Sequence, residues 1–461
     1  MSIVKAYTLP HPPLAVPAVG RGQEKEISKT LEAMDDVADE IAGIKPETII
    51  YITPHSAVYS DHFHISPGGT AYGDLSRFGA PGVKFYVKYD EELAGEISRI
   101  AEFNGISAGT QGERDPKLDH ATIVPMWSIH KRYTDYRALR ISQSGMSASE
   151  HYMMGQVIAK AAELTGRKTV LIASSDLSHK LKNDGPYGFA PEGPEFDAVF
   201  TGAIGKGDFL SLLKIPDSLR ERAAECGYNS LVILAGCFDK LNVHSKLLSY
   251  EGPFGVGYAV ASFTPGGENE HRNFLEQYIG LVLEESENRK NTEDEHQKLA
   301  RRSLEHIITT GEILPVPNGL PDELSKKRAG VFVSIHKNGR LRGCIGTIAP
   351  TTSSVANEIV QNAVSAGLSD ERFTPVTTEE LQYLVYKVDV LSAPEPISDP
   401  GQLDVKRYGV IVTSGRKRGL LLPNLDGIDT VEAQIEIARQ KAGISPREPL
   451  ELERFEVIRH E

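Results

Sequence analysis

The sequence predicts an α/β protein in which a layered domain built on a central sheet precedes a smaller α+β domain. The first observation is a set of short, largely apolar runs without polar alternation, at residues 47–53, 169–175 and 255–263. Such runs are typical of strands buried on both faces. The second observation is the helical stretches that separate them, at residues 22–43, 90–104 and 150–164. This alternation favours helices layered on a central sheet.

The chain of 461 residues is too long for a single ordinary core, and its pattern changes in one region. An apolar strand ends in "TPGG", and a helical stretch with a charged middle, "ESENRKNTEDE", follows it. We therefore predict a first domain at residues 1–266, a helical connector at 267–290 and a second domain at 291–461. The second domain is expected to begin at one of the helices in this stretch, and it contains a predicted hairpin that turns at Lys337-Asn338-Gly339. It continues with helices at 352–369 and 431–442 and strands at 384–392, 409–414 and 419–424.

The composition of the chain argues against several classes of function. The net charge of −13 and the lack of a Lys/Arg-rich block argue against a nucleic-acid partner. No apolar run approaches the ~20 residues of a membrane span, and no signal-peptide pattern opens the chain. The three cysteines are widely spaced and form no CxxC pair or disulfide framework. These observations favour a cytoplasmic location.

Titratable residues follow several of the predicted strands at the point where each strand ends. They occur in "LPHPP", "TPHS", "SSDLSH" and "YEGP", which supply His11, His55, Asp176, His179 and Glu251, and "LDHAT" adds Asp119 and His120 ahead of a further apolar stretch. Ligands of α/β sheets bind beyond the carboxyl ends of the strands, so these side chains are expected to converge. Prolines restrict the backbone around His11 and present its ring at a fixed angle. The Gly-rich stretch 66–82 is predicted to be a mobile loop near this site.

Two imidazoles and one carboxylate, from His11, His55 and Glu251, make the facial triad of non-haem Fe(II) sites. His120 and His179 remain as acid/base groups or substrate hydrogen-bonding partners, because imidazole titrates near neutral pH. Asp176 lies three residues before His179, where it orients that ring or holds a water molecule. For each histidine alone, the alternative is a hydrogen-bonded surface residue without a ligand.

The segments "HPP", "TPHS", "LDHAT", "SSDLSH" and "YEGPFGVGYA" make residues 1–264 similar to the class III extradiol ring-cleavage dioxygenases. This LigB-like group also includes the Memo-like proteins. The resemblance implies that His11, His55 and Glu251 bind Fe(II), that His179 is the acid/base group, and that His120 contacts substrate or oxygen. Some Memo-like members carry a cysteine as the third ligand, whereas Glu251 gives the dioxygenase type of ligand set.

The region from about 290 to 461 resembles the AMMECR family. The segments that carry this resemblance include "LRGCIGTI", "SDERFTPVTTEEL", "VDVLSAPEPI", "YGVIV", "GLLLPN" and "QKAGI", in that order. The two domains in one chain resemble the AmmeMemoRadiSam system, which also includes a radical SAM protein. A radical SAM partner is therefore implied.

The expected function is that of a metal-dependent enzyme, with Fe(II) as cofactor and Zn or Cu as alternatives. Its expected substrate is a catechol-like or otherwise chelating small molecule, oxidised with O₂. Two alternatives stay open. The same site would support a hydrolase or lyase that uses no oxygen, or the chain would be a non-catalytic metal- or peptide-binding adaptor that has kept the scaffold.

Overall fold

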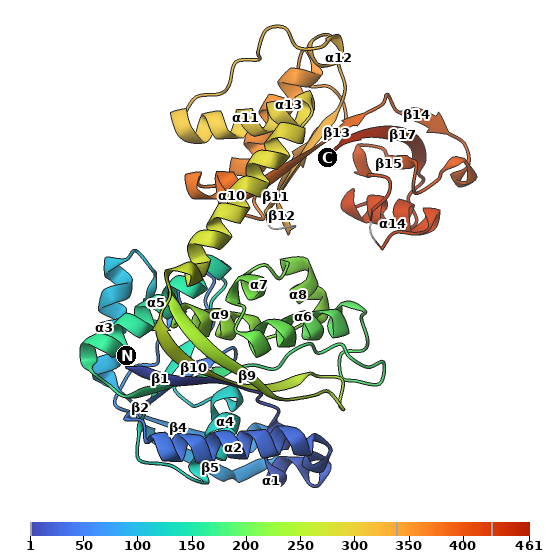
Figure 1. Ribbon diagram of the computed structural model, residues 1–461. Helices are drawn as coiled ribbons and strands as arrows, with labels where there is room; N and C mark the ends of the chain where they lie inside the picture. Colours follow the sequence, from blue (N-terminus) through green and yellow to red (C-terminus); the bar gives the residue numbers. More distant parts are fainter. Residues whose placement is uncertain (1, 338–339, 426) are drawn as a thin grey trace. The chain divides into compact units, whose positions relative to one another are not determined.

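The computed structural model describes residues 2–337, 340–425 and 427–461 (Figure 1). The chain divides into two compact units, residues 1–281 and 282–461. The division lies inside helix α10 (Phe274–Thr292) and within the connector that the sequence predicts. The turn predicted at 337–339 lies partly outside the described residues. No helix in the described part of the chain is both long enough and apolar enough to cross a membrane.

A six-stranded sheet forms the centre of the first unit, in the order β7-β2-β8-β1-β10-β9. Strands β7, β2, β8 and β1 run parallel to one another, whereas β10 is antiparallel to both β1 and β9. The bounds are β1 (Ile3–Leu9), β2 (Thr48–Thr53), β7 (Arg137–Ser142), β8 (Thr169–Ser174), β9 (Leu241–Glu251) and β10 (Tyr258–Glu268). Strands β2 and β8 are buried along their whole length, as apolar runs without alternation predict.

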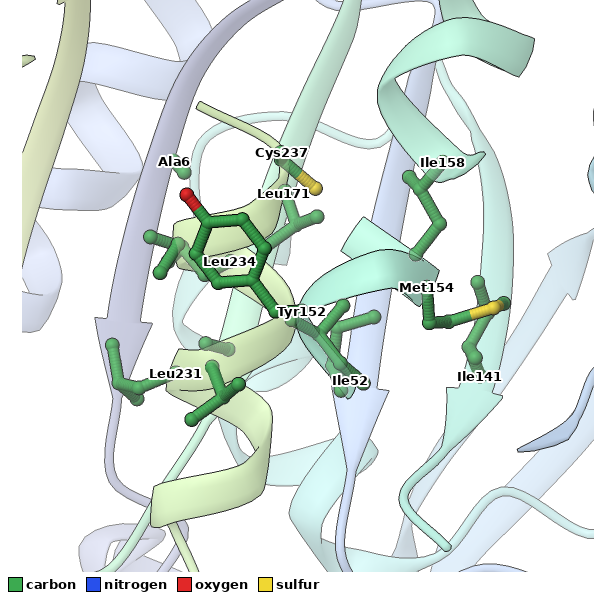
Figure 2. Close-up of a cluster of buried hydrophobic side chains, with 14 of the residues drawn as sticks. Ala6, Ile52, Ile141, Tyr152, Met154, Ile158, Leu171, Leu231, Leu234 and Cys237 are labelled. Atoms are coloured by element: carbon green, nitrogen blue, oxygen red, sulfur yellow. The ribbon is translucent and has the colours of Figure 1, made fainter. Parts of the chain in front are cut away.

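Helices cover both faces of this sheet, which confirms the predicted layered α/β fold (Figure 1). Ile50 and Ile52 of β2 face one core and Ile49 and Tyr51 face the other, because alternate residues of a strand point to opposite faces. Figure 2 shows part of the first core, where Tyr152 lies among leucine, isoleucine and methionine side chains. The helices of that face are α3 (Glu91–Phe103), α5 (Ala148–Thr165), α6 (Glu192–Lys206) and α9 (Tyr228–Gly236). Those of the other face are α2 (Ser28–Ile44) and α4 (His120–His130).

The remaining elements of this unit are short helices and two small sheets. The helices are α1 (Pro17–Gly20), α7 (Phe209–Leu213) and α8 (Asp217–Ala223), and β3 (Phe63–His64) pairs with β6 (Ala108–Gly109). The prediction of a mobile loop at 66–82 is wrong, because β4 (Thr70–Leu75) pairs there with β5 (Ala80–Lys88). A Cβ atom on Gly73 would meet Leu118 Cβ at 2.5 Å, so this glycine permits close packing rather than motion.

The second unit contains a seven-stranded antiparallel sheet in the order β12-β11-β13-β17-β15-β16, with β14 paired to β17. Its strands are β11 (Val331–Lys337), β12 (Arg340–Gly346), β13 (Leu384–Leu391), β14 (Glu395–Ile397), β15 (Tyr408–Ser414), β16 (Lys417–Leu421) and β17 (Glu451–His460). Its helices are α11 (Glu295–Thr310), α12 (Asp322–Ser325), α13 (Val355–Leu368) and α14 (Val431–Lys441). The predicted α+β character of this part of the chain is confirmed, and the unit has apolar cores of its own.

Candidate metal centre

Three neighbouring strands of the first unit end at the same edge of the sheet, and each is followed by a titratable residue at the same spacing. His11, His55 and Asp176 lie two residues beyond Leu9, Thr53 and Ser174, the last residues of β1, β2 and β8. Leu9 is paired with Ser174, and Ile52 is paired with Ala173. Because these strands are parallel and adjacent, the three side chains meet in space.

The tautomer of His11 follows from the hydrogen bond made by its second ring nitrogen. His11 Nδ1 lies 2.9 Å from Ser174 Oγ, which donates its own proton to the carbonyl of Ala121 at 2.6 Å. A serine hydroxyl has one proton, so Ser174 must accept from Nδ1–H. The lone pair of His11 is therefore on Nε2, and loss of solvation together with the nearby imidazoles lowers the pKa of this buried ring. His11 presents a neutral imidazole nitrogen, which is the form that binds a metal.

His55 and His120 complete a group of closely packed imidazoles. The ring centroids of His11 and His55 are 4.9 Å apart, and those of His55 and His120 are 4.6 Å apart in a stacked arrangement. Loss of solvation and repulsion by His120 lower the pKa of His55 to about 4. Loss of solvation also lowers the pKa of His120. Both rings are therefore neutral near pH 7.

The loop after β8 adds Asp176 and His179. Asp176 Oδ1 accepts a hydrogen bond of 2.7 Å from the backbone N–H of His11, and Asp176 Oδ2 lies 3.8 Å from His11 Nε2. Burial raises the pKa of Asp176 to about 7. His179 donates from Nδ1 to the carbonyl of Ala224, so its Nε2 is free to accept a proton, and loss of solvation lowers its pKa. The backbone N–H of His179 also donates to the carbonyl of Ala223 at 3.0 Å, and Asp176 contacts His11, so the loop lies beside the same site.

The structure does not bring Glu251 to these histidines. Its Oε2 accepts hydrogen bonds of 2.7 Å from both the backbone N–H and the hydroxyl of Thr30, at the start of α2. Glu251 ends β9, and β10 lies between β9 and β1. Adjacent strands are ~4.8 Å apart, so its backbone is about two strand spacings from β1. The predicted triad of His11, His55 and Glu251 therefore does not form.

Cys226 lies beside His11 and His55 as the third candidate ligand, in place of the predicted carboxylate of Glu251. Among the described residues, His11, His55 and Cys226 each offer one ligand atom, and these atoms all lie within 4.8 Å of one another. Cys226 Sγ is 3.5 Å from His11 Nε2. The backbone carbonyl of Cys226 accepts a 2.9 Å hydrogen bond from Gln143 Nε2, just beyond β7. No metal-binding spacing such as CxxC marks this residue in the sequence.

A glycine allows Cys226 to reach the histidines. A Cβ atom on Gly227 would lie 2.4 Å from Ser175 Oγ and 2.9 Å from the carbonyl oxygen of Asp176. Only a residue without a side chain permits this approach between the start of α9 and the end of β8. In the sequence, the glycine directly after Cys226 is the feature that indicates this close contact.

A buried polar network fixes the backbone around His55 and His120. Asp119 precedes α4 and caps it, accepting from Thr122 N at 3.1 Å and from Thr53 Oγ1 at 2.7 Å. Thr53 Oγ1 in turn accepts from His55 N at 3.2 Å. Arg140, which is 1% exposed, lies 3.5 Å from the Asp119 carboxylate and donates to the carbonyl of Lys117 at 2.6 Å. The imidazole pair is thus held by rigid elements rather than by a free loop.

The donor set fits a metal ion that takes nitrogen and sulfur ligands. Two neutral imidazoles and a thiol are gathered at one edge, and the hydrogen bond to Ser174 already orients one of the rings. Burial and the nearby carboxylates raise the pKa of the Cys226 thiol, so the proton on sulfur must leave before the sulfur can bind an ion. Three protein ligands leave further coordination positions for substrate.

Two families of known proteins match successive parts of the chain. Residues 5–261 match the family of the catalytic LigB subunit of aromatic ring-opening dioxygenase. The chain belongs to the LigB family. Residues 297–460 match the AMMECR1 family, so a LigB domain is followed by an AMMECR1 domain. This confirms the architecture expected from the sequence, and LigB-family proteins depend on a metal.

Relatives match all or part of the chain. A Clostridium acetobutylicum protein is 40% identical over 477 aligned residues, which cover 100% of this chain and 99% of that protein. A Thermotoga maritima protein is 48% identical over 36% of this chain and 98% of its own length. The solved structure of an uncharacterized Pyrococcus horikoshii protein is 32% identical, with a TM-score of 0.33, and covers 36% of this chain and 88% of that one.

Proposed function

We propose that the LigB domain is a metal-dependent enzyme whose ion is held by His11, His55 and Cys226. The observation that carries this proposal is the convergence of one ligand atom from each residue within 4.8 Å at the carboxyl edge of the sheet. The proposed substrate is a catechol-like small molecule that offers two neighbouring oxygen atoms to the open coordination positions. The family resemblance supports oxidative ring opening as the reaction.

His179 is the proposed acid/base group. Its Nδ1–H is engaged by the carbonyl of Ala224, so Nε2 is the free nitrogen. With its pKa lowered, the ring is neutral near pH 7 and would accept a proton from a substrate hydroxyl. Asp176 holds the backbone of His11, and His120, stacked on His55, faces substrate or oxygen in this proposal.

Fe(II) is the ion proposed for ring opening, because it supplies both a Lewis acid and a partner for O₂ when bound. The thiol of Cys226 supports a second candidate function. Compared with a ligand set of imidazole and carboxylate alone, a set that includes a cysteine shifts the metal preference toward zinc or copper. With such an ion the same residues suit a hydrolase or lyase reaction that consumes no oxygen. The radical SAM partner implied by the resemblance stays a prediction.

Metal analysis of full-length protein purified and reconstituted without oxygen tests the ligand set. We expect the His55→Ala and Cys226→Ala variants to lose the bound ion, whereas Glu251→Gln retains it. Glu251→Gln is the matched control, because it removes the charge of the residue that the sequence favoured. Retention of the full amount of metal by Cys226→Ala, together with its loss from Glu251→Gln, would overturn the assignment.

Substrate turnover separates the two candidate reactions. The iron-loaded protein is mixed with a panel of catechols, and product formation is followed together with oxygen consumption. Oxygen uptake that matches ring-opened product supports the dioxygenase reaction. Turnover without oxygen uptake excludes it and favours the hydrolase or lyase reaction.

A further inference from the structure

A second group of metal-binding side chains lies in the AMMECR1 domain, outside the centre described above. Asp294 precedes helix α11, His296 lies in the first turn of that helix, and His460 ends strand β17. Within the described residues, Asp294, His296 and His460 each offer one ligand atom, and these atoms all lie within 4.8 Å of one another. The helix and the strand, which are far apart in sequence, therefore meet through three donor groups.

The two imidazoles are in direct contact. Their ring centroids are 3.7 Å apart and their planes are inclined by 16°. Asp294 Oδ2 accepts a hydrogen bond from His460 Nδ1, and His296 Nδ1 lies 3.9 Å from Asp294 Oδ1. Asp294 Oδ1 also accepts from the backbone N–H groups of His296 and Gln297, at 2.9 and 3.0 Å, as the cap of the helix. The carboxylate is thus fixed in place by the backbone.

His296 has unused capacity for a ligand. Its side chain is 7% exposed, and within the described part of the chain its ring nitrogens make no hydrogen bond. No other residue in the described part of the chain therefore engages the lone pair of this ring through a hydrogen bond. Loss of solvation and the adjacent His460 lower the pKa of His296, so the ring is neutral and has a lone pair to give.

The charges around His296 favour a cation. The N-terminus of a helix carries a partial positive charge, which opposes a metal ion there. The negative charge of Asp294 counters this effect. The negative charges of Glu295 and Glu323 also raise the pKa of His296, so they favour a positive charge at this position. Two imidazoles and a carboxylate are nitrogen and oxygen donors suited to zinc and its first-row neighbours.

We infer that Asp294, His296 and His460 form a second metal site, which binds a divalent ion of the zinc class and ties the start of α11 to the end of β17. To bind it, His460 transfers its Nδ1 proton to Nε2, so that Nδ1 faces the ion in place of the hydrogen bond to Asp294. The rings must also turn out of their parallel stack, because the lone pairs of stacked rings do not point at one common position.

Zn²⁺ binding to the full-length, metal-stripped chain tests this site by equilibrium dialysis. We expect His296→Ala and Asp294→Asn to bind one equivalent of Zn²⁺ fewer than the wild type. Asparagine is itself a good helix cap, so Asp294→Asn removes the charge with little change to the fold. His306→Ala, on the same helix and half-buried, is the matched control and retains the wild-type stoichiometry. Loss of a direct ligand should weaken this site by more than the ~10–100-fold typical of outer-shell changes.

Cobalt spectra distinguish this site from the first one. The proposed first site contains the Cys226 sulfur and gives a thiolate-to-cobalt charge-transfer band, whereas the second site has no sulfur ligand. The Cys226→Ala variant should lose that band but keep the visible cobalt bands of the second site, and His296→Ala should do the reverse. If the visible bands and the Zn²⁺ stoichiometry of folded His296→Ala match the wild type, the two histidines are only a packed pair and the inference fails. If only the first site fails to bind metal, the wild-type chain should still bind the one equivalent of Zn²⁺ that is assigned to the second site.

Discussion

The imidazole of His11 depends on one serine hydroxyl for its orientation and for its tautomer. Ser174 Oγ accepts from His11 Nδ1 and donates to the carbonyl of Ala121. The adjacent Ser175 Oγ is buried and makes no hydrogen bond in the described structure. Two neighbouring serines at the end of one strand therefore have different roles, and a pair of variants separates them.

Ser174→Ala should weaken metal binding about 10–100-fold, the usual effect of losing the partner that orients a metal-binding histidine. The deletion also leaves the carbonyl of Ala121 without its donor, a cost of about 1–3 kcal/mol in stability. Metal affinity is measured by competition with a chelator, and stability by urea unfolding. Ser175→Ala should leave metal affinity unchanged. Equal losses in both variants would show that the hydrogen bond to His11 has no specific role.

The third ligand is the part of the metal site that the sequence did not predict correctly. His11, His55, Asp176 and His179 follow strands that the sequence reveals, and the structure brings all four together. Glu251 follows the same pattern, and the sequence does not show that β10 separates its strand from β1. Cys226 precedes a helix rather than following a strand, so the strand-end argument could not find it. Strand order is set by contacts between residues distant in the chain, which periodicity does not report.

At the scale of elements, the approach of α9 to the end of β8 determines where the cysteine lies. Gly227→Ala would place a Cβ atom 2.4 Å from Ser175 Oγ, so the two segments must move apart. We expect overpacking to cost about 1–3 kcal/mol of stability, together with weaker metal binding as Cys226 withdraws. Metal stoichiometry and urea unfolding measure the two effects.

Gly202→Ala in α6 is the matched control, because a Cβ atom there meets nothing within 4 Å. That change should leave metal binding unchanged and raise stability by up to about 1 kcal/mol, since alanine favours a helix over glycine. Unchanged metal binding in Gly227→Ala would show that the close approach of α9 does not position Cys226.

A buried carboxyl couples α6 to β9 and gives the fold a pH dependence. Asp197 on α6 accepts hydrogen bonds from Tyr250 of β9 at 2.6 Å and from Ser178 N at 2.8 Å. Burial raises the pKa of Asp197 to about 7, above the ~3.9 of an unfolded chain. The folded state therefore keeps a proton that the unfolded state loses. The stabilisation from Asp197 is complete below about pH 4 and disappears as the pH rises to about 7.

Asp197→Asn should reduce this pH dependence, because an amide cannot ionise. We expect the variant to gain stability relative to the wild type between pH 5 and pH 8, on the order of 1–2 kcal/mol. Urea unfolding at the two pH values measures the difference. Parallel stability profiles for the two proteins would contradict the assignment to Asp197.

At the scale of the whole molecule, each unit has its own apolar core and its own candidate metal site. The cores of residues 1–281 and 282–461 share no residue, and the two ligand groups each lie within one unit. The sequence predicted the layered form of the first unit. It did not reveal the second ligand group, because Asp294 and His460 are 166 residues apart and meet only through the fold.

Independent units with separate sites should respond separately to metal. In calorimetry of the full chain we expect two unfolding transitions, and the transition of the LigB domain is identified with residues 1–281 expressed alone. A metal at 100 times its dissociation constant adds about 2.7 kcal/mol to the unit that binds it. His55→Ala should therefore remove the metal-dependent rise of the first transition only, and His296→Ala that of the second only. If either variant lowers both metal-dependent rises, the two units do not bind metal independently, because binding in one would then stabilise the other.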